Sequence, residues 1–188
     1  MFEPVAGSFD MRSTLDSGGI SVMAGDGCQY KLRRIRPSDA ASLIRGYQAM
    51  SQEDKLSRMF YRVPEMTTAM AERFCSPGAE RDFCIVVEGR DALEGEILGG
   101  ARITEAGKGG SHEFSVSLRP EGRHKGLAAA ALASVLKVAQ EMGSHSVWGV
   151  ITSDNEPMLS LAKKLGFTLR PKPEDPTETV ARIELKKP

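Results

Sequence analysis

The sequence predicts a single α/β domain in which helices flank a mixed, mostly antiparallel sheet. First, 188 residues are enough to bury one compact core without the help of metals or disulfides. Second, runs of alternating apolar and polar residues between positions 82 and 118 indicate strands separated by glycine-rich turns. Third, a helical pattern at 127–142 lies between two strand-like runs, 111–118 and 147–151, and so forms one strand–helix–strand unit.

The first 28 residues are rich in Gly, Ser and Asp and show no sustained periodicity. We therefore expect a flexible N-terminal extension over residues 1–28 and a folded domain over residues 29–188. The domain begins with a strand at 30–36, which Pro37 ends. Ser38 is placed to cap a helix that runs to about residue 50.

The remaining elements follow from the same signals. Ser51 and Asp54 resemble a capping box that opens a helix reaching residue 60 or 61. Gly143 and Gly166 stop two later helices, and residues 170–178, "RPKPEDPTE", have the composition of a loop. The other predicted elements are a helix at 67–74, strands at 82–88, 96–104 and 111–118, a helix at 127–142, a strand at 147–151, a helix at 155–165, and strands around 168 and at 180–185.

The composition excludes several classes of function. The 25 basic and 25 acidic residues balance, so the chain has no global charge to attract nucleic acid. No run approaches the roughly 20 apolar residues of a membrane span, and the N-terminus does not resemble a secretory signal. The three cysteines lack the spacing of a disulfide framework or a zinc site. We therefore expect free thiols, no metal and a cytoplasmic protein.

The segment "SLRPEGRHKGLAAAALASVL" joins the strand at 111–118 to the longest helix. Its glycines, Gly122 and Gly126, let the backbone turn and approach a ligand closely. The first amides of the helix have no intrahelical partner, and the positive end of the helix dipole lies beside Arg123 and Lys125. The segment therefore suits a phosphate. An ordinary strand–helix turn with solvated charges is the alternative interpretation.

Arg123, Gly126 and Ala128 match the pattern R-x-x-G-x-A. This resembles the pyrophosphate-binding signature, Q/R-x-x-G-x-G/A, of the GCN5-related N-acetyltransferase (GNAT) superfamily. Downstream, "NEPMLSLAKKLGF" resembles the second coenzyme segment of that superfamily, in which Asn155 caps a helix and contacts the pantetheine arm; a cap alone is the alternative for Asn155. The resemblance implies a GNAT-like domain that binds acetyl-CoA. The coenzyme-binding residues that it implies are Val116, Ser117, Leu118, Arg123, His124, Lys125, Gly126, Leu127, Ala128 and Asn155.

Three blocks, "LRRIRPSDAASL", "MSQEDKLSRMF" and "HEFSVSLRPEGRHKGLA", resemble one branch of the superfamily, the bacterial Pat-type protein lysine acetyltransferases. Together with the coenzyme segments they cover nearly all of residues 30–186. The resemblance to this branch implies a protein lysine as the acetyl acceptor.

Glu113 lies on the polar face of the strand that enters the loop, six residues before Arg119. At about 3.3 Å per residue this is roughly 20 Å, comparable with an extended pantetheine arm. We therefore expect Glu113 to act as general base for the attacking amine, as the matching Glu of the Pat branch is proposed to do. A carboxylate paired with a nearby Arg or Lys is the alternative. Alternation places His112 on the opposite, apolar face, so we expect a packed histidine there.

The expected activity is direct acetyl transfer from acetyl-CoA to a protein lysine. A small-molecule amine is an alternative acceptor, and a noncatalytic acyl-CoA sensor is a second class of function. Many members of the superfamily carry a Tyr on the last helix that protonates the leaving thiolate, whereas Ala162 stands at that position here. The sequence leaves the oligomeric state open.

Overall fold

The computed structural model describes residues 10–51, 65–76, 78, 81–107 and 110–186. The helices are α1 (Met11–Ser17), α2 (Ala40–Gln48), α4 (Thr68–Cys75), α5 (Leu127–Glu141) and α6 (Glu156–Lys164), with short 3-10 turns η1 (Pro37–Asp39), η2 (Asp91–Leu93) and η3 (Pro120–Gly122). The strands are β1 (Ile20–Met23), β2 (Gln29–Arg34), β3 (Asp82–Glu88), β4 (Ile97–Glu105), β5 (Ser111–Leu118), β6 (Ser146–Thr152), β7 (Thr168–Lys172) and β8 (Asp175–Glu184). The helix predicted for residues 51–61 lies almost entirely outside the described residues.

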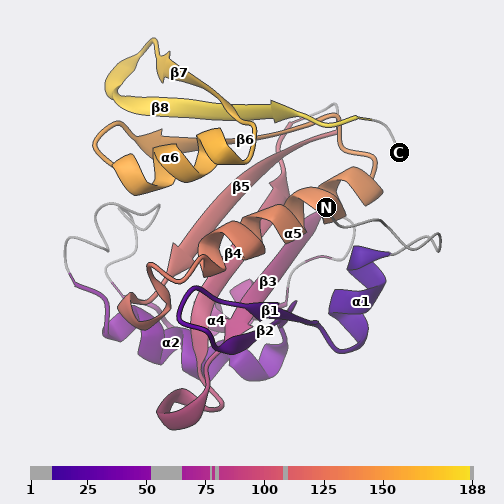
Figure 1. The fold of residues 1–188 in the computed structure, drawn as a ribbon, viewed down its shortest axis with the longest axis vertical. Coiled ribbons are helices and arrows are strands. Elements are labelled where there is room, and N and C mark those ends of the chain that lie inside the picture. Colours follow the sequence, from indigo (N-terminus) through magenta and orange to yellow (C-terminus); the bar gives the residue numbers. More distant parts are fainter. Residues whose placement is uncertain (1–9, 52–64, 77, 79–80, 108–109, 187–188) are drawn as a thin grey trace.

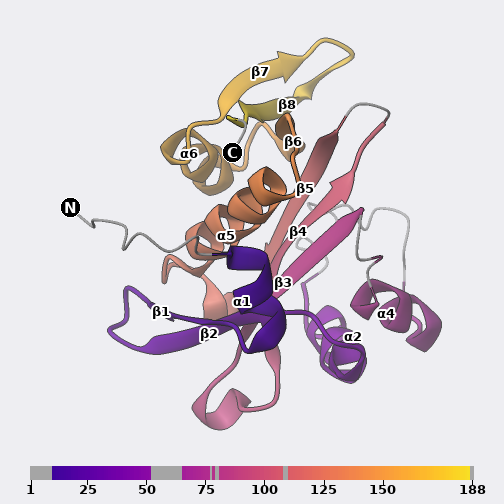
Figure 2. The same cartoon turned by 90° about the vertical axis from the view of Figure 1, so that its right-hand side faces the viewer.

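These strands form one eight-stranded sheet in the order β1-β2-β3-β4-β5-β6-β8-β7 (Figure 1). Every neighbouring pair is antiparallel except β5 and β6, which run parallel. Figure 2 shows α1 and α5 against one face of the sheet and α2 and α4 against the other. The predicted α/β class with a mixed, mostly antiparallel sheet is therefore confirmed. Among the described helices, none is both long and apolar enough to cross a bilayer.

The main core lies between the sheet and α5. On α5 the side chains of Leu132, Val135, Val138 and Ala139 are fully buried, and they recur at the spacing of one helix face. On β5 the buried residues alternate with partly exposed ones, as the sequence pattern predicts. This alternation turns Phe114 towards the main core and Glu113 towards the opposite face, which α2 and α4 flank.

Residues 10–28 differ from the expected extension without regular structure. They form α1 and β1, and β1 adds a strand to the edge of the sheet. Leu15 is only 1% exposed and belongs to the main core. The first two amides of α1, those of Met11 and Arg12, donate to the Glu141 carboxylate at 3.0 Å. Burial of an apolar side chain and a cap from a distant residue therefore give regular structure to a segment whose composition predicts no regular structure.

Two further expectations are corrected. The helical segment after β2 starts at Pro37, one residue before the predicted Ser38 cap, and the Asp39 carboxylate accepts from the Arg36 amide at 2.8 Å. Residues 170–178 belong to the hairpin of β7 and β8 instead of a loop, because 170–172 and 175–178 are strand and only 173–174 form the turn. Pro171 is tolerated there because β7 is an edge strand of the sheet.

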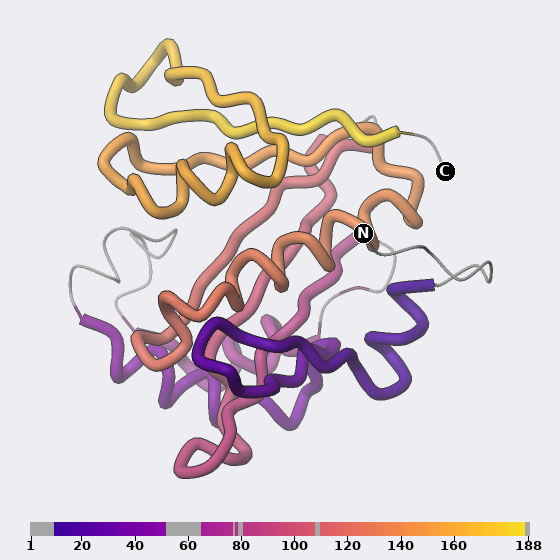
Figure 3. The backbone as a smooth tube through the Cα atoms, in the orientation of Figure 1, coloured from indigo at the N-terminus to yellow at the C-terminus, as the bar shows by residue number. Residues whose placement is uncertain are grey.

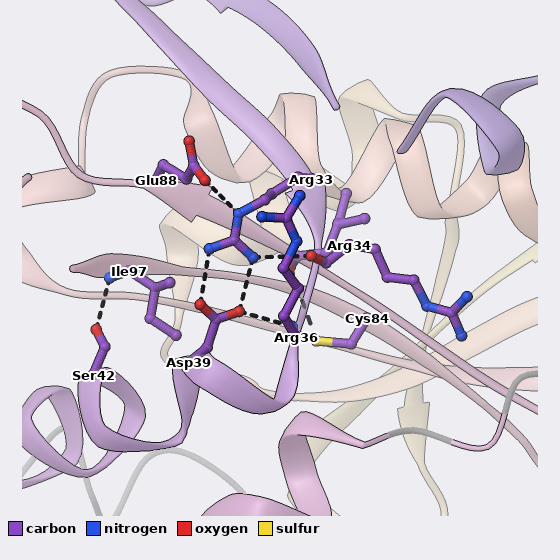
Figure 4. A network of polar contacts seen from close by, with 9 residues as sticks. Arg33, Arg34, Arg36, Asp39, Ser42, Cys84, Glu88 and Ile97 are labelled. Carbon is purple, nitrogen blue, oxygen red and sulfur yellow. Dashed lines mark hydrogen bonds and ion pairs between the residues drawn. The ribbon is translucent and has the colours of Figure 1, made fainter. Parts of the chain in front are cut away.

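A buried ion-pair network joins β2, η1 and β3 (Figure 4). The Arg33 guanidinium donates to both carboxylate oxygens of Asp39 at 2.8 Å and also pairs with Glu88. Arg33 and Asp39 are 6% and 7% exposed, so both charges are held away from water and compensate each other. This network fixes the start of α2 against the sheet.

Strands β5 and β6 form a fork. Their pairing covers only Ser111 to Glu113 against Ser146 to Trp148. Beyond that point the two strands diverge, as Figure 1 shows. The Phe114 ring lies at the base of the fork, 5.0 Å from the Phe167 ring and so close to Gly149 that a Cβ there would lie 2.7 Å from it.

Candidate active site

The loop after β5 presents unpaired amides. Gly126 caps α5 with φ 79°, a left-handed conformation that glycine adopts without strain. The first helical bond of α5 is that from the Ala130 amide to the Gly126 carbonyl, at 3.1 Å. The amides of residues 127–129 therefore have no hydrogen-bond acceptor within the described part of the chain. Three donors at the positive end of a 15-residue helix suit the negative oxygens of a diphosphate.

The side chains of this loop are more constrained than the sequence suggests. Arg123 Nε donates to the Leu118 carbonyl at 3.2 Å. His124 is exposed and, with φ 59°, occupies the left-handed region. Lys125 Nζ donates to the Tyr30 hydroxyl at 2.7 Å and lies 3.1 Å from the Asp26 carboxylate. Asp26 and Tyr30 lie almost 100 positions before the loop, so no sequence pattern near the loop indicates these contacts.

The end of β5 lies between the loop and the fork. Ser117 and Leu118 stand opposite Gly100 and Gly99 of β4. A Cβ at Gly99 would lie 2.0 Å from the Ser117 carbonyl, so the absence of a side chain lets β4 approach β5 closely. From Phe114 onwards, β5 pairs with β4 alone among the described strands. The backbone of residues 116–118 therefore runs along the open side of the fork and ends at the amides of α5.

Asn155 caps α6, as the sequence predicts. Its Oδ1 atom accepts from the Met158 amide at 3.2 Å. The helix places Ala162, for which the resemblance leads us to expect a Tyr, in the main core with 0% exposure, and an alanine offers no hydroxyl there. A contact between Asn155 and the pantetheine arm stays a prediction.

Glu113 is the half-buried carboxylate of the fork. It stands opposite Thr104 of β4 and Trp148 of β6, at the last position where β5 pairs with both neighbours. No described residue forms an ion pair or hydrogen bond with its side chain, so the alternative of a structural Arg or Lys partner finds no support. The nearest guanidinium in the register, that of Arg102, pairs with Asp82 instead. Burial raises the pKa of Glu113.

His112 faces the core, as expected. It is 5% exposed, and its Nδ1 atom lies 2.6 Å from the Ser144 hydroxyl. Its Nε2 atom is buried without a partner among the described residues. Burial lowers the pKa of His112 and so favours the neutral form of the ring. Among the residues that the structure describes, no group of three or more His, Cys, Asp or Glu side chains could hold a metal ion.

The site combines two parallel strands that diverge, a helix start whose amides have no acceptor among the described residues, and a half-buried carboxylate where the strands separate. This arrangement suits a long phosphorylated ligand with a proton acceptor at its far end. Comparison with known families agrees with this description. Residues 30–168 match the family model described as "Acetyltransferase (GNAT) domain". The chain therefore belongs to the GNAT family, and it is an acetyl-CoA-dependent acetyltransferase.

Solved structures share the fold. The GNAT domain of S. lividans PAT superposes with a TM-score of 0.77 at 20% identity, covering 89% of this chain and 97% of that one. Mycobacterium smegmatis RimJ in complex with CoA-disulfide gives 0.69 at 20% identity, covering 89% and 87%. The putative acetyltransferase yncA from Salmonella typhimurium with acetyl-CoA gives 0.63 at 19% identity, covering 84% and 94%.

Proposed function

We propose that this protein transfers the acetyl group of acetyl-CoA directly to the side-chain amine of a protein lysine, with Glu113 as the general base. The observation that carries the proposal is a half-buried carboxylate without a partner among the described residues, on the strand that leads to the unpaired amides of α5. The resemblance of "HEFSVSLRPEGRHKGLA" to the Pat-type acetyltransferases supports the same assignment.

Removal of a proton from the lysine ammonium is the step for which the reaction needs a group of the protein. A lysine side chain has a pKa of about 10.4 and is almost wholly protonated near neutral pH, so its nitrogen has no free lone pair for attack. Glu113 accepts one proton from the ammonium, directly or through a water molecule. Because burial raises the pKa of Glu113, its carboxylate is a stronger base than an exposed glutamate. The neutral amine then attacks the thioester carbonyl, the carbon–sulfur bond breaks, and the thiolate takes a proton from solvent or from the substrate.

The coenzyme site extends from the fork to the helix start. The amides of Gly126, Leu127 and Ala128, with the backbone next to Arg123 and His124, hold the diphosphate. The backbone of residues 116–118 pairs with the pantetheine arm and supplies an amide that polarises the thioester carbonyl. Asn155 contacts the arm from the start of α6.

The protein lysine acceptor rests on the Pat resemblance and on the similarity of the fold to the GNAT domain of S. lividans PAT. A small-molecule amine would use the same proton transfer, so the acceptor has to be found by experiment. Cys75 and Cys84 are free thiols whose pKa values burial raises, to about 11 and about 12, so both stay protonated. Unpaired thiols suit the reducing cytoplasm in which we place the reaction.

The test measures CoA release and labelled acetyl transfer with a panel of proteins, lysine peptides and small amines. Glu113→Gln keeps the shape of the side chain and removes the base, so we expect kcat to fall by about 100-fold to 10,000-fold while CoA still binds. Glu184→Gln is the matched control, because Glu184 is an exposed strand carboxylate of the same sheet that pairs with Arg182. Full activity of Glu113→Gln would refute Glu113 as the general base. Labelling of small amines alone would show that the acceptor is a small amine and not a protein lysine.

A further inference from the structure

The turn between β1 and β2 contacts the phosphate-binding loop. The Gly25 amide donates to the Lys125 carbonyl at 2.9 Å. The Lys125 ammonium reaches both Asp26 and Tyr30, and the Tyr30 hydroxyl donates to Asp26 at 2.9 Å. Figure 3 shows this indigo turn beside the start of the orange helix α5. We propose that the turn is part of the coenzyme site and that Asp26 and Tyr30 are positioning residues, which hold the loop ready for the diphosphate through Lys125.

This inference rests on the proposed function, and it adds a segment that the family match does not include. The match to the family model begins at residue 30, so Gly25 and Asp26 lie outside the matched residues. They reach the loop because β1 pairs with β2 in an antiparallel hairpin, with Met23 opposite Gln29. Leu15, buried in the main core, ties the preceding helix to the rest of the domain.

The hydrogen bond from the Gly25 amide to the Lys125 carbonyl fixes the direction of the Gly126 N–H, which is one of the donors to the phosphate. In a trans peptide the carbonyl and the following N–H point in opposite directions, and the described chain contains no cis peptide. Because the Lys125 carbonyl points to the turn, the Gly126 N–H points away from it. Gly126 has a flexible backbone, so without the bond this peptide could rotate and withdraw the donor. The turn thus reduces the ordering that ligand binding requires.

The ammonium of Lys125 is held by Asp26 and Tyr30, on the side of the β1–β2 turn. It has three donors, and two of them are directed to Tyr30 and Asp26. It also lies 5.2 Å from the centre of the Tyr30 ring. Because the charges of Lys125 and Asp26 cancel locally, the pair adds little net attraction for a diphosphate. Lys125 therefore fixes the loop, which differs from the direct contact with the ligand that the resemblance implies.

The direction in which Asp26→Asn changes CoA affinity distinguishes the two roles of Lys125, positioning the loop and binding the phosphate directly. If Lys125 positions the loop, Asp26→Asn weakens CoA binding, because the loop loses its anchor. If Lys125 binds phosphate directly, Asp26→Asn frees a cation and tightens binding, most of all at low salt. Tyr30→Phe keeps every charge and the aromatic ring and removes only the hydroxyl, so it tests the anchor without a change in electrostatics.

Calorimetry with CoA at about 0.05 M and about 0.3 M salt gives the readout. We expect Asp26→Asn, Tyr30→Phe and Lys125→Met each to raise Kd by about threefold to tenfold at both salt concentrations, the loss expected for one hydrogen bond. The Asp26→Asn, Lys125→Met double variant should bind no more weakly than Lys125→Met. With acetyl-CoA we expect a higher KM and an unchanged kcat. Asp16→Asn, which removes an exposed ion pair with Arg34 in the same N-terminal segment, is the control and should bind as the wild type does.

Tighter binding by Asp26→Asn, or Kd values of Asp26→Asn and Tyr30→Phe equal to that of Asp16→Asn, would overturn the inference and leave the acetyltransferase untouched. Failure of the wild-type protein to bind CoA would overturn the inference and the proposed function together. Melting temperatures of Asp26→Asn and Tyr30→Phe, measured alongside, separate a local loss of the anchor from unfolding: a KM effect that persists well below the melting temperature is the expected result.

Discussion

Asp39→Asn tests the buried ion pair at the start of α2. The wild-type carboxylate accepts three hydrogen bonds, two from the Arg33 guanidinium and one from the Arg36 amide. An asparagine of the same shape offers one acceptor oxygen, and its NH₂ group must face a donor. Arg33 keeps Glu88 and the Arg34 carbonyl as partners but loses its main countercharge.

The expected cost follows from these contacts. One lost charge-assisted hydrogen bond costs about 1.5–3 kcal/mol, and breaking a buried pair by removing one partner costs about 3–5 kcal/mol. Since Glu88 still compensates part of the Arg33 charge, we expect the free energy of unfolding to fall by about 3 kcal/mol. For a chain of this length that lowers the melting temperature by roughly 6–12 °C.

Urea unfolding and differential scanning calorimetry measure this loss. Burial alone would raise the pKa of Asp39, but the hydrogen bonds from Arg33 and from the Arg36 amide lower it below its usual range. A lowered carboxyl pKa contributes stability that is present above the unfolded value of about 3.9 and is lost as pH falls through the folded value. The difference between wild type and Asp39→Asn should therefore shrink below about pH 4. A change below about 0.5 kcal/mol at pH 7, within the range of ordinary surface substitutions, would refute the reasoning.

Four further predictions concern the fork and the strand that carries the base. Gly149→Ala places a Cβ 2.7 Å from the Phe114 ring, so we expect unfolding to become easier by about 1–3 kcal/mol, measured by urea denaturation; an unchanged midpoint would contradict the tight packing. Ser144→Ala leaves both ring nitrogens of buried His112 without a partner among the described residues, and should cost about 1–3 kcal/mol. Because the folded pKa of His112 is lowered, stability should fall as pH drops below about 6.5, and a His112→Gln variant should lack this slope. The kcat defect of Glu113→Gln should shrink as pH rises to about 10.4 and above, where half or more of the free lysine is already neutral, and a constant defect would argue for another role.

The strands and helices of the central sheet could be predicted because each signal is local. Residues 82–88 and 111–118 have the bounds of β3 and β5, since alternation and the flanking turn residues mark both ends. The start of α5 follows from Gly126 and the alanine-rich run after it. Glu113 was placed on the right face for the same reason, because side chains alternate along a strand.

The sequence could not give the contacts that join distant segments. α1 has seven residues, too few to be stable alone, and its first amides are capped by Glu141 from the far end of α5. Asp39 carries an ion pair with Arg33 that is visible only when β2 and η1 are folded together. A search for local caps finds Ser38 instead, because local rules contain no information on which side chain the tertiary fold will bury.

The same limit explains the two cations of the coenzyme loop. A motif identifies Arg123 and Lys125 by type and position, and a cation next to a phosphate-binding helix start suggests a direct contact. In the folded chain Arg123 Nε donates to the Leu118 carbonyl and Lys125 is directed to Asp26 and Tyr30, so both side chains brace the loop from outside. The proposed coenzyme site therefore uses the backbone amides that the glycine leaves exposed as the main ligands for the diphosphate, and we propose that the cations align those amides. A family motif thus predicts where a binding site lies, whereas the contacts of its charged residues depend on segments outside the motif.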